Sequence, residues 1–376
     1  MKAKSIKGRS VEEIKSAIED NMSDGYRPTS AIVFTSEEND RSEITEYLRD
    51  KKIQTFGSST GANFIDGDLN PEGTVVLLMD MKPEYFRIEI KSTDEGSIKE
   101  IAEQIGKMGL TKFKKPAFLV VSGGLATDGD DIVEGLEKAC GKGTTIFGGL
   151  AADKLLMQKT YVFTNEKLTD SGLLALILNE EKISLKGLAV GGWKPIGIDR
   201  IITKSRGNVV YTIDNEPALD FIKRYAGLKE MEWSSSFGFV LASNFQLQFM
   251  RDNKHPMMRT PMIANEDGSI VFAGSLPEGS RVRLSLLPGF EVVDEAIQQF
   301  KKFKNQEQNA DALILFSCAG RQLSLGPYVS EEINGIKETW NAPLAGFFCF
   351  GEIGRVAEDV HEFHNMTCSL AILREN

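Results

Sequence analysis

One plan of residues occurs three times along the sequence. Each copy starts with a short apolar run, passes through a turn rich in serine and glycine into a helical pattern, and returns to an apolar run that ends at glycines. The copies span residues 30–64, 117–155 and 311–354. Two apolar runs around one helix are typical of a βαβ unit, in which the strands lie parallel and the helix crosses over them in the right-handed sense. The repeat therefore predicts three βαβ units.

Between these units the pattern changes to the alternation that is typical of antiparallel strands, at residues 73–81, 85–91, 171–180, 183–193 and 207–214. A second mixed region carries expected helices at 216–227 and 292–306 and expected strands at 236–242, 262–274 and 279–287. At 376 residues, the chain is too long for one compact domain. We expect an α/β fold of mixed α+β character, with repeated βαβ units, additional antiparallel strands and two domains, 1–218 and 219–376.

The composition argues against several classes of protein. A formal net charge of -10 and a pI of about 5.1 disfavour binding to nucleic acid, because proteins that bind the phosphate backbone concentrate lysine and arginine. The four cysteines lack CxxC spacing and are too few for a disulfide scaffold, which favours a reducing compartment. The first twenty residues have the pattern of a charged amphipathic helix, and no run reaches membrane-spanning length. We expect a cytoplasmic protein without membrane insertion.

Glycine, serine and small polar residues follow the predicted strands of each unit. Loops after the carboxyl ends of parallel strands gather at one edge of a sheet, and open α/β sheets usually bind ligands at that edge. Because small residues let a ligand approach the backbone closely, we expect these loops to form a ligand site. The expected ligand-binding residues that follow the second strands are Ser59, Thr60, Gly149, Asp153, Gly351 and Glu352.

Seven stretches occur in the order in which the FIST (F-box and intracellular signal transduction) family has them: FGSSTGA, IFGGLAAD, SRGNVVYTIDNEPALDF, EDGSIVFAGSLPEG, LILFSCAGR, PLAGFFCFGEIG and FHNMT. The chain therefore resembles this family from about Ser30 to its C-terminus. The resemblance implies a bacterial or archaeal signalling protein with N- and C-terminal FIST domains that binds a small polar ligand such as an amino acid. Some relatives bind haem and report nitric oxide to a kinase. Because the sequence carries no kinase-like nucleotide motif, we expect action on a separate partner, such as the histidine kinase of a two-component system.

Arg321 follows the first strand of the third unit, in a loop with Ser317 and Cys318. A guanidinium group binds a carboxylate through two parallel hydrogen bonds, which lysine does not. Arg321 is therefore expected to hold the carboxylate of an amino-acid or organic-acid ligand, with Glu352 holding its ammonium group or orienting Arg321. The alternative is an ion pair within the protein, between Arg321 and Glu352 or Asp153. For Glu352 and Asp153 a further alternative is that each carboxylate caps the turn that follows it.

Cys318 has three interpretations: a packed apolar residue, a wall of the ligand pocket, or a nucleophile. A catalytic cysteine needs a base within hydrogen-bond reach, and His364 is a candidate for that base. Cysteine is also among the most buried residue types. No GxSxG motif or cofactor fingerprint accompanies Cys318 or Ser317, so we expect a protein that is not an enzyme and keep a Cys or Ser nucleophile as an alternative.

His364 and Asn365, in the FHNMT stretch, are expected beside the third unit and among the ligand-binding residues. His361 and His364 differ by an odd number of positions, so on a strand they point to opposite faces and do not share a metal ion. No metal or cofactor is therefore expected. One histidine suffices for haem iron, so a haem-based sensor of nitric oxide is kept as an alternative.

Two further stretches, one acidic and one rich in methionine, have patterns that suggest a structural or binding role. The aspartates of ATDGDD, residues 126–131, are expected at the solvated start of a helix, whose dipole they complement. The methionines of HPMMRTPM, residues 255–262, either form an adaptable binding surface or pack inward.

Overall fold

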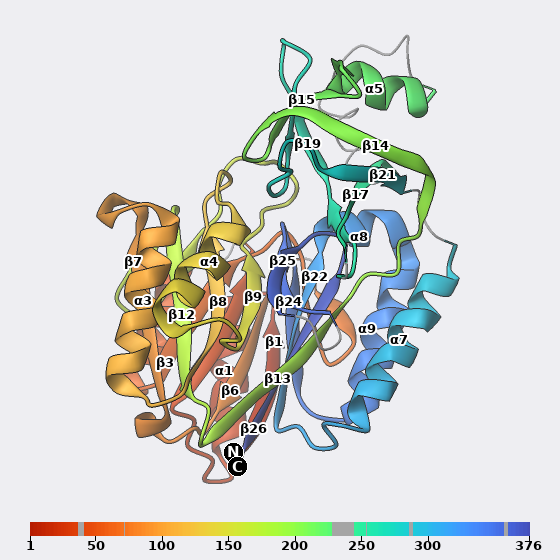
Figure 1. Ribbon diagram of the computed structural model, residues 1–376. Coiled ribbons are helices and arrows are strands. Elements are labelled where there is room, and N and C mark those ends of the chain that lie inside the picture. Colours follow the sequence, from red (N-terminus) through yellow and green to blue (C-terminus); the bar gives the residue numbers. More distant parts are fainter. Residues whose placement is uncertain (37–40, 71, 228–243, 253, 286–288, 357–359) are drawn as a thin grey trace.

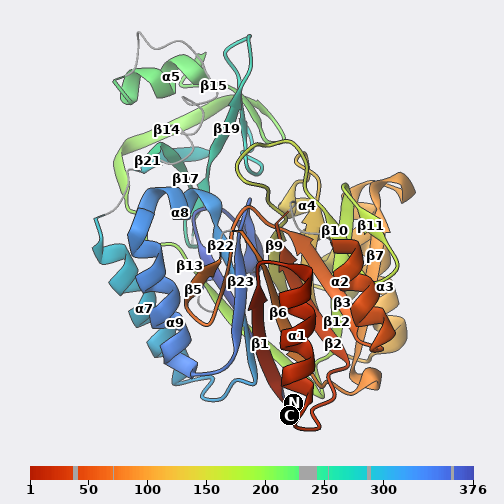
Figure 2. The same cartoon turned by 180° about the vertical axis from the view of Figure 1, so that it is seen from behind.

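The computed structural model describes residues 1–36, 41–70, 72–227, 244–252, 254–285, 289–356 and 360–376. Three six-stranded sheets form the larger part of the molecule, which we call the body. A smaller group of strands lies above one end of the body (Figures 1 and 2). We call this smaller part, within residues 191–290, the lid. The predicted mixed α+β class with two domains is confirmed.

Three repeats with one order of elements build the body. In each, an outer strand leads to a helix, a strand, a second helical segment, a parallel strand, a hairpin and an antiparallel strand. The first repeat comprises β1 (Ala3–Gly8), α1 (Val11–Met22), β2 (Ser30–Thr35), α2 (Arg41–Asp50), β3 (Gln54–Ser59), β4 (Asn63–Ile65), β5 (Asp68–Asn70) and β6 (Thr74–Met79). The second comprises β7 (Phe86–Ser92), α3 (Ile98–Lys112), β8 (Pro116–Gly123), α4 (Gly129–Cys140), β9 (Ile146–Leu150), β10 (Val162–Phe163), β11 (Leu168–Thr169) and β12 (Gly172–Asn179). The third comprises β13 (Ile183–Val190), α7 (Glu291–Lys304), β22 (Ala312–Cys318), α8 (Ala319–Leu325), α9 (Val329–Trp340), β23 (Leu344–Cys349), β24 (Glu352–Arg355), β25 (His361–His364) and β26 (Cys368–Glu375).

The three predicted βαβ units are confirmed. The parallel pairs are β2 with β3, β8 with β9, and β22 with β23, with Val33 opposite Gly57 and Phe316 opposite Phe347. The pairs lie in three different sheets, so the expectation of a single shared sheet edge was wrong. Each unit instead takes an antiparallel strand of its own repeat as its other neighbour: β6, β12 or β26.

The hairpin of each repeat pairs with the sheet of another repeat. Hairpin β4–β5 extends the sheet of β23, hairpin β10–β11 extends the sheet of β3, and hairpin β24–β25 extends the sheet of β9. The exchange is cyclic and joins all three repeats. As a result, the carboxyl ends of the parallel strands meet at one end of the body, where Ala152 N donates to Ser59 O at 3.3 Å and Leu150 N donates to Gly351 O at 2.9 Å.

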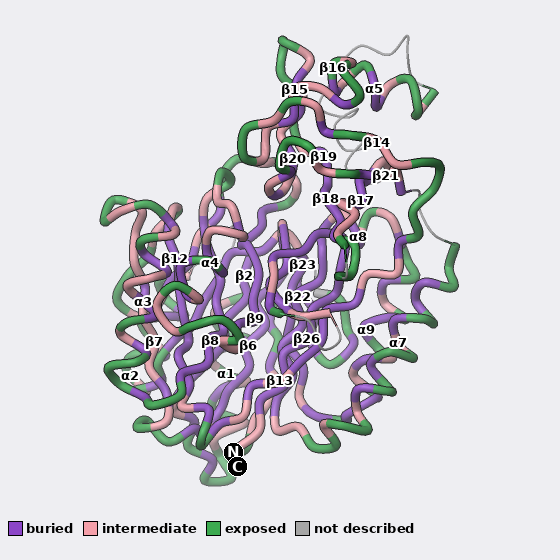
Figure 3. The backbone as a smooth tube through the Cα atoms, viewed as in Figure 1, coloured by how far each residue is buried: buried purple, intermediate pink, exposed green. Residues whose placement is uncertain are grey.

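The inner strands β2, β8 and β22 are buried on both faces, which explains their continuous apolar runs in the sequence. Along β2, Ile32 and Phe34 face the core that the three sheets share, whereas Ala31 and Val33 pack against helices α1 and α2. The same alternation holds in β22, where Phe316 joins the shared core and Leu315 packs beneath the outer helices. Figure 3 shows this buried centre within a more exposed layer of helices.

The lid is an insertion into the third repeat, between β13 and α7. Its elements are β14 (Pro195–Arg206), β15 (Val209–Ile213), β16 (Glu216–Pro217), α5 (Ala218–Tyr225), β17 (Gln246–Met250), β18 (Met257–Arg259), β19 (Pro261–Ala264), β20 (Ile270–Phe272) and β21 (Arg281–Ser285). In its sheet the end strands are β18 and β19, which Thr260 alone separates in the chain, so the sheet curls around a core that includes Phe221, Leu247 and Phe272. The strand predicted at 236–242 lies outside the described residues.

Candidate functional site

A cavity lies between the lid and the body, at the end of the body where the parallel strands finish. Its volume is about 330 Å³, which is within the range of pockets for small ligands. The body contributes the loops after β8, β9 and β23, and the lid contributes the β14–β15 turn, β19 and β20. The lining residues are Gly124, Leu125, Ala126, Thr127, Leu150, Ala151, Met157, Asn208, Met262, Ile263, Val271, Phe272, Ala273, Gly274, Phe350 and Phe363.

This position agrees with the prediction that loops after the strands form a ligand site, although the individual residues differ. The stretches SGGLATDGDD, GGLAAD and GFFCFGEI all reach the cavity, through Gly124–Thr127, Leu150–Ala151 and Phe350. None of the ligand-binding residues predicted from the sequence is among the described residues that line it. Sequence reasoning missed the lid's contribution, because nothing in a strand pattern shows which loop an inserted segment covers.

An arginine of the lid is buried against the body beside this cavity. Arg259, with only 2% of its surface exposed, donates to Asp130 Oδ2 at 2.9 Å and to the main-chain oxygens of Phe363 and Ser275 at 3.2 and 3.1 Å. Asp128 Oδ2 accepts from Ser275 Oγ at 2.9 Å. The lid is thus tied to the N-terminus of α4 through charged and polar groups that satisfy one another.

The expectation of a solvated helix start at ATDGDD was therefore wrong in part. Asp128 caps α4 by accepting from Asp130 N at 3.0 Å, but Asp130 itself lies under the lid. Its burial raises the pKa of its carboxyl, and Arg259 opposes that rise. In HPMMRTPM, inward packing is confirmed for Met257 and Met258, which are buried, whereas Met262 lines the cavity.

A second tie between lid and body lies on β25. Glu362 accepts from Arg251 Nη1 and Nη2 at 2.6 and 3.0 Å, and Lys254 Nζ lies 3.2 Å from the same carboxylate. These bonds hold the pKa of Glu362 below its ordinary value, against the effect of burial. Both ties use residues of the lid between β17 and β19.

Arg321 lies away from the cavity and is fully buried. Its Nε donates to Glu332 Oε2 at 2.9 Å, its Nη2 also bonds Glu332, and its Nη1 donates to Gly191 O at 2.7 Å and Met366 O at 3.3 Å. The guanidinium carbon lies 4.8 Å from the centre of a Trp193 ring. Arg321 thus forms an ion pair within the protein, and its partner is Glu332 of α9, not Glu352 or Asp153.

Glu352, Cys349 and Cys318 form a buried cluster below the strand ends. Glu352 Oε2 accepts from Thr367 N at 3.0 Å and from Thr367 Oγ1 at 2.8 Å, and Cys349 Sγ lies 3.3 Å from Glu352 Oε1. Burial raises the pKa of Glu352 to about 8, although these hydrogen bonds act in the opposite direction. Burial, with the Glu352 carboxylate nearby, raises the pKa of the Cys318 thiol. A thiolate is therefore strongly disfavoured at Cys318.

Ser59, Thr60 and Asp153 are used to hold loops together. Ser59 Oγ accepts from Tyr161 N at 2.8 Å and donates to Ala152 O at 3.2 Å, and Thr60 Oγ1 lies 3.3 Å from Asn63 Nδ2. Asp153 accepts from Gln158 N at 2.8 Å and Met157 N at 3.1 Å. Asp153 thereby fixes the 153–158 turn, which carries Met157 into the cavity wall.

The remaining predicted residues lie around β24 and β25. Glu352 is opposite both Gly149 and His364, and Gly351 O accepts from Leu150 N. Asn365 Oδ1 lies 3.4 Å from Thr260 N of the lid. The structure thus brings Gly149, Gly351, Glu352, His364 and Asn365 together, as a support beneath the cavity rather than its wall. Ser317 lies in the same layer, with Cys349 Sγ 3.3 Å from its main-chain oxygen.

The histidines do not present a ring nitrogen to the cavity. His364 Nε2 lies 3.2 Å from Gly354 O, and burial lowers the pKa of His364 to about 4. His361 packs edge-on against Phe147, and burial lowers its pKa to about 3. Among the described residues that line the cavity there is no imidazole, so these residues do not fit an axial haem ligand there. The described residues also contain no group of three or more metal-ligating side chains.

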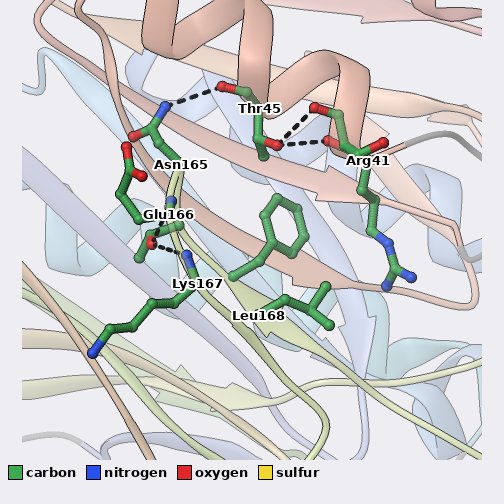
Figure 4. Close-up of a pocket in the computed structure, with 9 residues that line it drawn as sticks. Arg41, Thr45, Asn165, Glu166, Lys167 and Leu168 are labelled. Carbon is green, nitrogen blue, oxygen red and sulfur yellow. Dashed lines mark hydrogen bonds between the residues drawn. The ribbon is translucent and has the colours of Figure 1, made fainter.

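A second hollow lies on the outer surface of the body, between α2 and the β10–β11 hairpin. Figure 4 shows Thr45, Asn165 and Lys167 around this hollow of about 360 Å³. Asn165 Nδ2 donates to Thr45 O at 3.3 Å. The side chain of Asn165 therefore attaches the exchanged hairpin to α2. It is remote from the lid, and none of the predicted site residues lines it.

Comparison with known protein families identifies the chain. Residues 29–216 match the FIST N domain, and residues 218–355 match the FIST C domain. The chain belongs to the FIST family. The two matches confirm the resemblance inferred from seven short stretches. FIST domains are sensory domains of signal transduction. The start of the FIST C domain at residue 218 falls inside the lid, at the first residue of α5.

Mycobacterial proteins are among the curated relatives of this FIST protein. Uncharacterized protein Rv0628c of Mycobacterium tuberculosis (strain ATCC 25618 / H37Rv) is 25% identical over 242 residues, which cover 61% of each chain. Uncharacterized protein Mb0898c of Mycobacterium bovis is 25% identical over 243 residues, which cover 61% of this chain and 60% of the relative. The match thus spans about three fifths of the length of these relatives.

No helix within the described ranges is long and apolar enough to cross a membrane.

Proposed function

We propose that this FIST protein is a cytoplasmic sensor that binds a small ligand in the cavity between lid and body and acts on a separate signalling protein. The observation that carries the proposal is the position of the cavity. It lies at the carboxyl ends of the parallel strands, where α/β proteins usually bind ligands, and one of its walls belongs to an inserted segment. A ligand there contacts both parts and can therefore stabilise one arrangement of lid and body over another.

The proposal is of a binding protein and not of an enzyme. It is supported by the burial of Cys318 and by the raised pKa of its thiol, because the thiolate is the nucleophilic form. Ser317 Oγ is also buried, and no described residue bonds to it as a general base would.

The resemblance implies an amino-acid-like ligand and a histidine kinase as the partner. The kinase belongs to this proposal, whereas the ligand is proposed here only as a small molecule, because no described residue that lines the cavity carries a charge. Haem with nitric-oxide sensing is the second candidate and rests on the resemblance alone. Purified protein that shows a Soret band with about one haem per chain would favour that candidate. A colourless protein whose thermal midpoint rises with one class of small organic molecule supports the ligand cavity.

The proposal that ligand changes the arrangement of lid and body is tested by fixing the lid to the body with a disulfide. Asp128 and Ser275 face each other across the seam, with 2.9 Å between Oδ2 and Oγ, so the double substitution Asp128→Cys and Ser275→Cys places two thiols there. We expect ligand to change the solution scattering profile and the affinity for the kinase in the reduced form, and to change neither in the oxidised form. The matched control is the pair Thr203→Cys and Thr212→Cys, whose hydroxyl oxygens lie 2.7 Å apart within the lid. Identical profiles and affinities with and without ligand in the reduced form would refute this ligand-dependent rearrangement.

A further inference from the structure

The cavity between lid and body is apolar on both sides. Three phenylalanines line it: Phe350 and Phe363 from the body and Phe272 from the lid. Leucine, isoleucine, valine and methionine supply six of the other lining residues, and glycine, alanine, threonine and asparagine supply the rest. Two methionines, Met157 and Met262, face it from opposite sides of the seam, and such flexible side chains adapt to irregular apolar ligands.

No described residue of the lining carries a charge. The charged groups Arg259 and Asp130, beside the cavity, are paired with each other and with main-chain groups of Ser275 and Phe363. A zwitterion that entered the cavity would lose the hydration of its ammonium and carboxylate groups without meeting a counter-charge. The lining therefore disfavours a free amino acid, although the resemblance implies one.

One lining side chain offers an unused acceptor. Asn208 Nδ2 donates to Phe272 O at 3.0 Å, which orients the amide. Within the described part of the chain, no hydrogen bond to Asn208 Oδ1 occurs. This oxygen, in the β14–β15 turn, can accept one hydrogen bond from a ligand in the cavity.

We propose that the cavity binds a small uncharged molecule with an apolar, ring-sized body and one hydrogen-bond donor. This inference rests on the proposed function, since it names the class of ligand for the same cavity. The volume of about 330 Å³ is at the lower end of ligand pockets, which suits one or two fused rings. The apolar body packs against Phe272 and Phe350, and the donor bonds Asn208 Oδ1.

Indole and tryptophan are the probes that test this class. Both have the same fused ring and N–H group, but tryptophan adds an ammonium and a carboxylate. We expect calorimetric titration of the full chain to give at least tenfold tighter binding for indole than for tryptophan. Tighter or equal binding of tryptophan overturns the inference, and so does a failure of indole to bind.

Variants decide whether the probe occupies this cavity. Val271→Trp fills it from the lid, and Ala126→Trp fills it from the body, so a folding defect in one leaves the other. Ile198→Trp is the matched control, because Ile198 lies in the lid on β14, is 67% exposed and does not line the cavity. We expect both filling variants to abolish indole binding, and the control to retain it. If a probe binds and neither filling variant weakens it, the cavity itself is refuted and the proposed function fails with it.

The hydrogen bond has its own test. Benzofuran has the shape of indole but an oxygen in place of the N–H group. We expect Asn208→Leu to weaken indole binding about tenfold and to leave benzofuran binding unchanged, because only indole donates to Asn208 Oδ1. An equal loss for both probes contradicts the proposed donor contact. If tryptophan binds better than indole and the filling variants abolish its binding, the cavity is retained and only the ligand class is wrong.

Discussion

Arg259 of the lid and Asp130 of the body form an ion pair across 129 positions of sequence, with 2.9 Å between Nη2 and Oδ2 and side chains that are 2% and 27% exposed. The pair sits beside the ligand cavity, since Thr127 precedes Asp130 by three residues and Gly274 packs against Arg259. A side chain at Gly274 would place its Cβ 2.7 Å from Arg259 Nε, so glycine at this position lets the segment after β20 pack against the guanidinium within the lid. Because Gly274 also lines the cavity, the attachment of the lid to the body and the cavity wall depend on neighbouring residues.

Replacing Arg259 by methionine removes the cation and leaves the partly covered Asp130 carboxylate without its partner. We expect Arg259→Met to lower the free energy of unfolding by about 1–3 kcal/mol, and urea denaturation measures this loss. Adding Asp130→Asn should recover part of it, because the unpaired charge is then gone. Arg281→Met is the control: its side chain is 46% exposed and pairs with Asp199 and Asp252, so a change within about 0.5 kcal/mol is expected. Equal losses in Arg259→Met and Arg281→Met would contradict the role of the Arg259–Asp130 pair.

The Arg321–Glu332 pair is the most buried ion pair described in the body, with side chains 0% and 1% exposed. Arg321→Met is expected to destabilise the protein by about 3–5 kcal/mol, since Glu332 would remain as an uncompensated buried charge. Arg321→Lys should restore little, because lysine does not reproduce the fork that also serves Gly191 O and Met366 O. The control is Arg224→Met, because the side chain of Arg224 is 45% exposed in its ion pair with Glu216. A small effect at Arg321 would show that the pair is not essential to the body.

Glu352 should make stability depend on pH near neutrality. Its pKa is raised to about 8 in the folded state by burial, so between about pH 5 and pH 8 the folded chain retains a proton that the unfolded chain releases. The free energy of unfolding contributed by Glu352 therefore falls as pH rises through this window, by at most about 1.4 kcal/mol per pH unit. Glu352→Gln removes this contribution. Denaturation of both proteins at pH 5.5, 6.5 and 7.5 measures the difference, and parallel pH profiles would show that the pKa of Glu352 is not raised.

The thiols should be inert in the folded protein. Burial raises the pKa of Cys318, Cys349 and Cys368, and these three cysteines are buried, whereas Cys140 is partly exposed and its pKa is raised to about 11. We expect a disulfide reagent such as DTNB to react slowly with Cys140 alone at pH 8, and with all four cysteines after denaturation. Rapid labelling of Cys318 in the native protein would revive the nucleophile interpretation. Cys318→Ser is the control that identifies the labelled position.

Local pattern was enough to predict the elements of the body. Residues 30–64 have the apolar runs and the helix between them that make β2, α2 and β3, and residues 292–306 have the spacing that makes α7. The strands at 171–180 and 183–193 were likewise found from alternation, as β12 and β13. These predictions succeed because strand and helix periods are properties of neighbouring residues.

The residues of the site were much harder to predict. For Arg321, the sequence left open a ligand carboxylate and an ion pair with Glu352 or Asp153, and Glu332 was not considered. Only the packing of α8 on α9 selects Glu332. Arg259 lies within the HPMMRTPM stretch, and the sequence pattern predicted no role for it. A buried arginine in a stretch of methionine and proline is a weak signal, because nothing local distinguishes it from a solvated one.

By itself, the sequence determined the three strand–helix–strand repeats, the mixed α+β class and membership of the FIST family. These depend on periodicity and on short ordered motifs, which are local. The tertiary structure decided that the three units lie in separate sheets joined by exchanged hairpins, and that the described residues between β13 and α7 form a lid over the strand ends. Sheet partners and the cavity are set by contacts between residues far apart in the chain, such as Asp130 with Arg259, and a local pattern carries no record of those contacts.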